Sequence, residues 1–120
     1  MATVLIIDDS SMSRRILRNI VESAGHTAVE ASDGLTGLEQ YFLQKPDVVL
    51  LDLIMTGMFG VDVLRKIREM DGQARVIVAT ADIQASTRTM TQAAGATAFV
   101  TKPFAAEDVL QAISLALGES

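Results

Sequence analysis

The sequence predicts an α/β fold in which helices cover both faces of an open, doubly wound, parallel sheet. Short apolar runs of strand length recur along the 120 residues and alternate with segments of helical periodicity. Three of these runs are continuous in Val, Leu and Ile. Strands that are covered on both faces lack the alternation of half-exposed strands, so continuous apolar runs are typical of a parallel sheet.

Five segments have the length and composition of strands. They are residues 3–8, 27–31, 47–52, 75–80 and 97–101. The connections between them are long enough to hold one helix each, as parallel strands require, and such crossovers are right-handed. The chain is therefore expected to consist of five strand–helix units in sequence order.

The first helix carries the most complete set of signals. Apolar residues in segment 11–24 recur every three or four positions. Ser10 or Ser11 is available as the N-cap, and Gly25 stands where a left-handed residue commonly ends a helix.

Four further helices are expected. The second is marked by Leu35, Leu38 and Phe42 and ends near Pro46, the third by Val61, Leu64 and Ile67, and the fifth by Val109, Leu110, Ile113 and Leu117 before Gly118. The fourth, at about residues 84–94, is poor in large apolar side chains and rich in Thr and Ser. Because these residues favour caps and turns, this helix is expected to be the least stable.

Length and composition limit the class of protein. The length suits one domain, and no linker, repeat or low-complexity tract divides residues 1–120. The absence of cysteine excludes disulfides and thiolate metal sites, and the chain start without a secretion signal predicts a cytoplasmic protein. The apolar runs are too short for membrane insertion. A net charge of −5 and 4% aromatic residues argue against a nucleic-acid partner.

Polar residues follow four of the predicted strands. Asp8 and Asp9 follow the first, Asp52 the third, Thr80 the fourth and Lys102 the fifth. In doubly wound sheets the carboxyl ends of the strands form the ligand site. Clustered carboxylates repel one another unless a cation lies among them, and oxygen-only ligands favour Mg²⁺. Asp52 could then act as a nucleophile toward a phosphoryl group, assisted by Mg²⁺, Lys102 and Thr80.

Each of these residues also has an ordinary interpretation. Asp8 and Asp9 could cap a helix beside Ser10, Asp52 could be a loop residue, and Lys102 could be a solvated surface charge. Their joint placement at the ends of four strands favours a chemical site over four unrelated surface groups.

Four motifs in register carry a resemblance to a known family. The segments LIIDDSS, VVLLDLIM, VIVAT and FVTKPF resemble the receiver domain of bacterial two-component response regulators, and are most similar to the single-domain, CheY-like type. The resemblance runs from about Thr3 to Leu117. It implies a flavodoxin-like fold with strand order 2-1-3-4-5 and one receiver domain over residues 1–120.

The resemblance also implies a role for each site residue. Asp52 would accept a phosphoryl group from a phosphohistidine of a sensor histidine kinase or a phosphotransfer protein. Asp9, Asp52 and the backbone carbonyl of Ile54 would bind Mg²⁺ directly, and Asp8 would act through a metal-bound water. Lys102 would pair with the phosphoryl oxygens.

The same resemblance implies a switch. Thr80 would move to bond the phosphoryl group and Phe99 would turn inward with it, which changes the face formed by the fourth helix, fifth strand and fifth helix. That face would signal to a downstream target protein. The chain would be a monomer or weak dimer that catalyses only its own phosphorylation and dephosphorylation, and it would not otherwise be an enzyme. The Lys102–Pro103 peptide bond would be cis.

The loop after Asp52 departs from the family pattern. Thr56 stands where the family commonly has proline, and Phe59 stands where an aspartate commonly precedes Gly60. The loop therefore lacks a φ restraint and a helix N-cap, and is expected to be mobile or held by other contacts. Met58 and Phe59 would either pack back on the domain or form an apolar spot for a partner.

Two other functions remain open. The first is a receiver-like interaction module that works without phosphorylation, which Thr56 and Phe59 suggest. The second is an aspartate-nucleophile phosphohydrolase. That class usually has a second aspartate two residues after the first, where this chain has Ile54.

Overall fold

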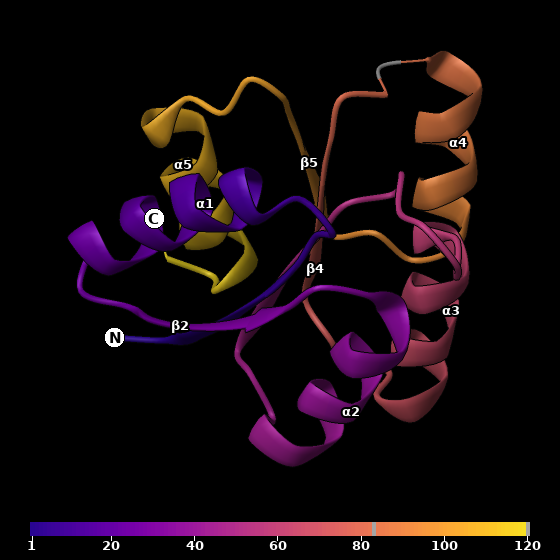
Figure 1. Ribbon diagram of the computed structural model, residues 1–120, viewed down its shortest axis with the longest axis horizontal. Coiled ribbons are helices and arrows are strands. Elements are labelled where there is room, and N and C mark those ends of the chain that lie inside the picture. Colours follow the sequence, from indigo (N-terminus) through magenta and orange to yellow (C-terminus); the bar gives the residue numbers. More distant parts are fainter. Residues whose placement is uncertain (83, 120) are drawn as a thin grey trace.

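The computed structural model describes residues 1–82 and 84–119, and its strands form one parallel five-stranded sheet (Figure 1). The strands are β1 (Thr3–Ile7), β2 (Thr27–Ala31), β3 (Val48–Leu51), β4 (Val76–Thr80) and β5 (Ala98–Thr101). Their order is β2-β1-β3-β4-β5, so the predicted fold class and strand order are confirmed. The order reverses at β1, whose carboxyl end lies beside that of β3.

Helices cover both faces of the sheet. They are α1 (Ser11–Ser23), α2 (Gly34–Gln44), α3 (Gly60–Met70), α4 (Ala85–Ala93) and α5 (Ala106–Ala116). Figure 1 shows α1 and α5 on one face, and α2, α3 and α4 on the other. Within the described residues, no helix has both the length and the apolar character needed to cross a bilayer.

Buried strand residues explain why the runs are continuously apolar. Alternate side chains of β1 point to opposite faces: Val4 and Ile6 join the core beneath α1 and α5, whereas Leu5 and Ile7 join the core beneath α2 and α3. All four residues of β3 are fully buried. A strand with a core on each side needs apolar residues at every position, as the sequence predicts.

The helix ends agree with the capping signals. The Ser10 hydroxyl oxygen accepts a hydrogen bond from the Ser13 N–H at 3.2 Å, and Gly25 follows α1 with a φ of 87°. In α4 no side chain caps the N-terminus, and its buried residues are Thr87 and Thr91 rather than large apolar residues. The low stability expected of α4 stays a prediction.

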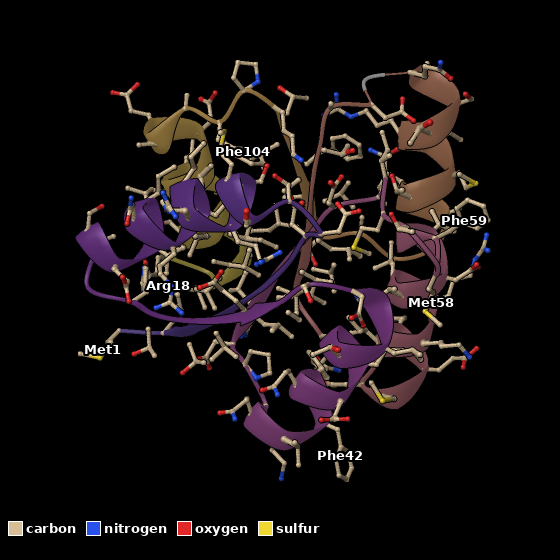
Figure 2. The ribbon with its side chains drawn as sticks, viewed as in Figure 1. Met1, Arg18, Phe42, Met58, Phe59 and Phe104 are labelled. Carbon is tan, nitrogen blue, oxygen red and sulfur yellow. The ribbon has the colours of Figure 1, made fainter. Side chains whose placement is uncertain are left out.

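Ion pairs join α1 to the edge strand β2. Glu30 accepts hydrogen bonds from the guanidinium groups of Arg14 at 3.1 Å and Arg18 at 2.6 Å (Figure 2 labels Arg18). The hydrogen bond from Arg18 is the main cause of a lowered pKa for the Glu30 carboxyl. The carboxylate form of Glu30 is therefore stabilised in the folded protein.

Glu30→Gln is expected to lower the free energy of unfolding at pH 7, by no more than about 1 kcal/mol because the ion pairs are partly exposed. A lowered folded-state pKa stabilises the protein above the ordinary value of 4.5, and this contribution is lost as the pH falls through the folded-state pKa. Urea unfolding of both proteins from pH 7 to pH 3 should therefore show a difference that shrinks with acid. A difference in unfolding free energy that stays constant from pH 7 to pH 3 would contradict the predicted role of the Glu30 carboxylate.

Candidate functional site

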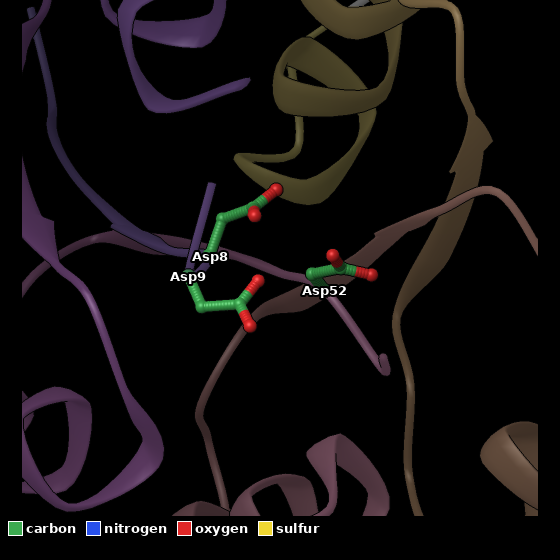
Figure 3. Close-up of side chains that lie close together, drawn as sticks. All are labelled: Asp8, Asp9 and Asp52. Carbon is green, nitrogen blue, oxygen red and sulfur yellow. The ribbon is translucent and has the colours of Figure 1, made fainter. Parts of the chain in front are cut away.

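Three carboxylates meet where β1 and β3 end. Asp8 and Asp9 follow β1 and Asp52 follows β3, and one oxygen of each lies within 4.8 Å of the others (Figure 3). The two strands are paired up to Ile7 and Leu51, and the Asp52 N–H donates to the Ile7 carbonyl oxygen at 2.9 Å. The predicted convergence of these three side chains is therefore confirmed. Asp8 and Asp52 are only 1% and 3% exposed, whereas Asp9 is exposed.

Lys102 supplies a positive charge to the cluster. Its Nζ lies 3.1 Å from Oδ2 of Asp52 and 3.2 Å from Oδ2 of Asp8. The Lys102 N–H donates to the Thr80 carbonyl oxygen at 3.0 Å, which ties the residue to the end of β4. Burial alone would lower the pKa of Lys102, but the hydrogen bond and charge of Asp52 and the charge of Asp8 outweigh it and raise the pKa. Lys102 is therefore an ammonium at neutral pH.

Asp8 is the carboxylate whose bonding is incomplete. Its Oδ1 accepts a hydrogen bond from the Ser10 N–H at 2.9 Å. Its Oδ2 is buried and accepts no hydrogen bond from the described residues, although the Lys102 ammonium is at ion-pair distance. Burial, together with the charge of Asp52, raises the pKa of Asp8, while the Ser10 hydrogen bond and Lys102 lower it less. A buried acceptor without a donor is costly, so this oxygen favours a cation nearby.

The donor set fits a hard divalent cation. When ionised, three carboxylates and one ammonium leave a formal charge of −2, which one divalent ion neutralises. All the candidate ligand atoms are oxygens, as Mg²⁺ prefers. The cluster could therefore hold a metal ion.

The loop after Asp52 is held at Thr56. The Thr56 N–H and hydroxyl both donate to Oδ2 of Asp9, at 3.1 and 3.3 Å. The Ile54 N–H donates to Oδ1 of Asp52 at 3.2 Å, and the Gly60 N–H donates to the Leu53 carbonyl oxygen at 3.2 Å. The loop is therefore held by hydrogen bonds, which is the second of the two alternatives that the sequence left open for it.

The side chains of Met58 and Phe59 differ in burial. Met58 is half-buried and packs against the core beneath α2 and α3. Phe59 is 71% exposed and points away from the domain (Figure 2), and it lines a groove with Ile54 and Met90. Of the two alternatives that the sequence left open, Met58 packs back on the domain, and Phe59 does not. The N-terminus of α3 has no side-chain cap, as the loss of the aspartate implies.

Thr80 lies at the strand end beside Lys102 without bonding to the carboxylate cluster, and Phe99 lies on the neighbouring strand β5. Thr80 is fully buried at the end of β4, and its hydroxyl oxygen accepts a hydrogen bond from the Asp82 N–H at 3.3 Å. No hydrogen bond joins its hydroxyl to Asp52 or Lys102 in the described part of the chain. Phe99 is half-buried on β5, with the Arg88 guanidinium carbon 5.1 Å from the centre of its ring. The Lys102–Pro103 peptide bond is cis, as the resemblance implies.

The five-stranded parallel fold and the carboxylate cluster at its edge define a class of protein. Comparison with known sequences identifies the same class. The chain belongs to the response regulator receiver domain family, whose model matches residues 4–114. Receivers are signalling modules of two-component systems, so the resemblance inferred from the motifs is confirmed.

Several of the relatives are chemotaxis proteins. The chain is 37% identical to chemotaxis protein CheY of Bacillus subtilis (strain 168), over 95% of this chain and 96% of that protein. It superimposes on the Vibrio cholerae chemotaxis protein CheY4 with a TM-score of 0.93 at 27% identity, covering 98% and 99% of the two chains. It is 33% identical to a chain in the CheX-CheY-BeF3-Mg+2 complex from Borrelia burgdorferi, with a TM-score of 0.90 over 94% and 87% of the two chains.

Proposed function

We propose that this protein is a Mg²⁺-dependent phosphoacceptor whose acceptor is Asp52. The observation that carries the proposal is the position of this carboxylate. Asp52 is buried at the end of β3, 3.1 Å from the Lys102 ammonium, and lies beside the carboxylates of Asp8 and Asp9. An ordinary loop aspartate would not need this arrangement, because burying a carboxylate without a partner is costly.

Asp9, Asp52 and the backbone carbonyl of Ile54 would bind the metal ion directly, with Asp8 acting through a water. When bound, Mg²⁺ would neutralise negative charge on the transferring oxygens. The formal charge of the cluster supports this assignment, as does the buried Oδ2 of Asp8, which is paired with Lys102 but accepts no hydrogen bond from the described residues. The Mg²⁺ of the Borrelia complex belongs to that relative, and makes the same ion the first to test here.

The chemical step is a phosphoryl transfer to an oxygen of Asp52. A carboxylate oxygen attacks the phosphorus of a phosphohistidine, so an O–P bond forms as the P–N bond breaks. The imidazole nitrogen leaves with the electron pair of the broken P–N bond, and the ring departs as neutral imidazole because its other nitrogen carries a proton. Lys102 would exchange part of its contact with Asp52 for a contact with the new phosphoryl oxygens. The protein would catalyse only this reaction and the hydrolysis that reverses its effect.

The conformational response would begin at Thr80. Its hydroxyl accepts from the Asp82 N–H at 3.3 Å, so turning it to donate to a phosphoryl oxygen would give up that contact and draw in the loop after β4. Phe99 would turn inward with it. Because Arg88 of α4 lies over the Phe99 ring, a movement of that ring would be transmitted to α4. The face formed by α4, β5 and α5 is therefore the proposed output surface.

The proposed partners are two classes of protein. One is a sensor histidine kinase or phosphotransfer protein that supplies the phosphoryl group, and the other is a downstream target of the output surface. Both would meet a cytoplasmic monomer or weak dimer. CheX is a partner of the Borrelia relative, and its complex shows only that a family member can be captured with another protein.

The proposal predicts that Asp52→Asn abolishes phosphoryl acceptance. The wild-type chain, given Mg²⁺ and a small phosphodonor or beryllofluoride, should change its amide NMR spectrum and, with the donor, gain the mass of one phosphoryl group. The variant should do neither, because an amide nitrogen or oxygen cannot form the acyl phosphate.

Identical wild-type spectra with and without the donor would exclude the proposal. The interaction module that works without phosphorylation would then be the better function, and the exposed Phe59 would be its first candidate contact.

A further inference from the structure

Thr56 makes contacts that a proline at this position could not make. Its backbone N–H lies 3.1 Å and its hydroxyl oxygen 3.3 Å from Oδ2 of Asp9. Proline has neither a backbone N–H nor a hydroxyl group. Thr56, at a position where the family commonly has proline, therefore adds two hydrogen-bond donors beside the carboxylate cluster.

Both donors contact the same oxygen. This leaves Oδ1 of Asp9 free of the Thr56 contacts, so one oxygen is held while the other is available to a cation. Asp9 is the exposed member of the carboxylate cluster, whereas Asp8 and Asp52 are buried by the surrounding chain. It is therefore the ligand whose side-chain rotation is least restricted by packing.

We infer that Thr56 is a positioning residue for Mg²⁺, which fixes the Asp9 carboxylate for ligation through its free oxygen. The inference rests on the proposed function, because it assigns Thr56 a role at the same metal site. An exposed carboxylate loses rotational freedom when it binds a cation, and a carboxylate that is already held loses less. Hydrogen bonds from the protein to metal ligands act in this way at other metal centres.

The same contacts connect the loop to the metal site. Thr56 lies in the loop between β3 and α3, 47 positions from Asp9 in the sequence, and joins this loop to the end of β1. A cation that fixes Asp9 should therefore also reduce the motion of the loop. Replacing the hydroxyl group should weaken both effects, although the backbone N–H would remain.

The test is a Mg²⁺ titration of the full chain without a phosphodonor, followed by amide NMR shifts. Thr56→Val should raise the dissociation constant about three- to tenfold, and Thr56→Pro, which also removes the N–H, by about tenfold or more. Thr56→Ser keeps the hydroxyl and should stay within about twofold of wild type. Thr27→Val makes the same substitution at an exposed position on β2, and should bind Mg²⁺ as wild type does.

Hydrogen exchange across residues 53–60 gives a second readout. Mg²⁺ should slow exchange in the wild-type loop more than in the Thr56→Val loop. Wild-type affinity in Thr56→Val, or tighter binding, would overturn the inference, and tighter binding would mean that Thr56 competes with the cation for Asp9. If the wild-type chain itself binds no Mg²⁺, both the inference and the proposed function fail. Wild-type affinity in Thr56→Val overturns the inference alone, so the two failures are distinguishable.

Discussion

Gly60→Ala is expected to lower the free energy of unfolding by about 3 kcal/mol, because overpacking against backbone cannot be relieved by turning a side chain. An added Cβ at Gly60 would lie 2.4 Å from Cα of Leu53 and 2.5 Å from the carbonyl oxygen of Asp52. The Gly60 N–H also donates to the Leu53 carbonyl oxygen, so moving α3 away would break that bond. The displaced backbone carries Asp52, so phosphoryl acceptance should fall together with stability. Urea unfolding and labelling of the same variant measure the two effects.

Gly72→Ala is the matched control. A Cβ at Gly72 would meet no described atom within 4 Å, and the residue does not have a positive φ. Its free energy of unfolding should stay within about 0.5 kcal/mol of wild type, or rise slightly because alanine restricts the unfolded chain. Equal urea midpoints for the two variants would show that the close approach at Gly60 does not constrain the loop.

The fold could be predicted from the sequence because its local and long-range signals agree. The continuous apolar run at residues 48–51 required a core on each side of a strand, and the structure places one there. Ser10 and Gly25 marked the ends of α1 through local backbone requirements that do not depend on the rest of the chain. The strand order came from the family resemblance, since the apolar pattern alone does not distinguish one order of parallel strands from another.

The acidic cluster could be predicted for a different reason. Parallel strands point their carboxyl ends to one edge, so polar residues that follow several strands must approach one another. This rule placed Asp8, Asp9, Asp52 and Lys102 correctly relative to one another. It does not determine where a hydroxyl group points, and Thr80 bonds the Asp82 N–H instead of the cluster.

The contact between Thr56 and Asp9 could not be predicted in the same way. The two residues are 47 positions apart, and the contact depends on the path of an irregular loop whose backbone dihedrals no periodic pattern specifies. The available signal was a residue with two hydrogen-bond donors where the family commonly has none. The different positions of Met58 and Phe59 have the same origin, because both follow Gly57, whose φ of 91° belongs to an irregular turn that no periodic pattern specifies.

Lys102→Met is expected to slow phosphoryl acceptance from a small donor by at least about 100-fold, the effect of removing one donor that stabilises developing charge. The Lys102 ammonium lies within 3.2 Å of carboxylate oxygens of both Asp8 and Asp52, so it is close to any phosphoryl group formed on Asp52. Methionine keeps a similar stem length and packing but has no charge and no donor. Quenched-flow labelling at saturating Mg²⁺ measures the rate.

The same Lys102→Met variant should bind Mg²⁺ more tightly than wild type, although it accepts the phosphoryl group more slowly. Removing the ammonium leaves Asp8, Asp9 and Asp52 with no cation beside them among the described residues, so their attraction for a divalent ion should increase about fivefold, which corresponds to about 1 kcal/mol. Lys66→Met, an exposed position on α3, removes the same charge elsewhere and should alter neither quantity. Slower transfer with tighter Mg²⁺ binding would separate a charge-stabilising role of Lys102 from a structural one, because a damaged site would lose both. Wild-type transfer rates in Lys102→Met would remove Lys102 from the proposed mechanism.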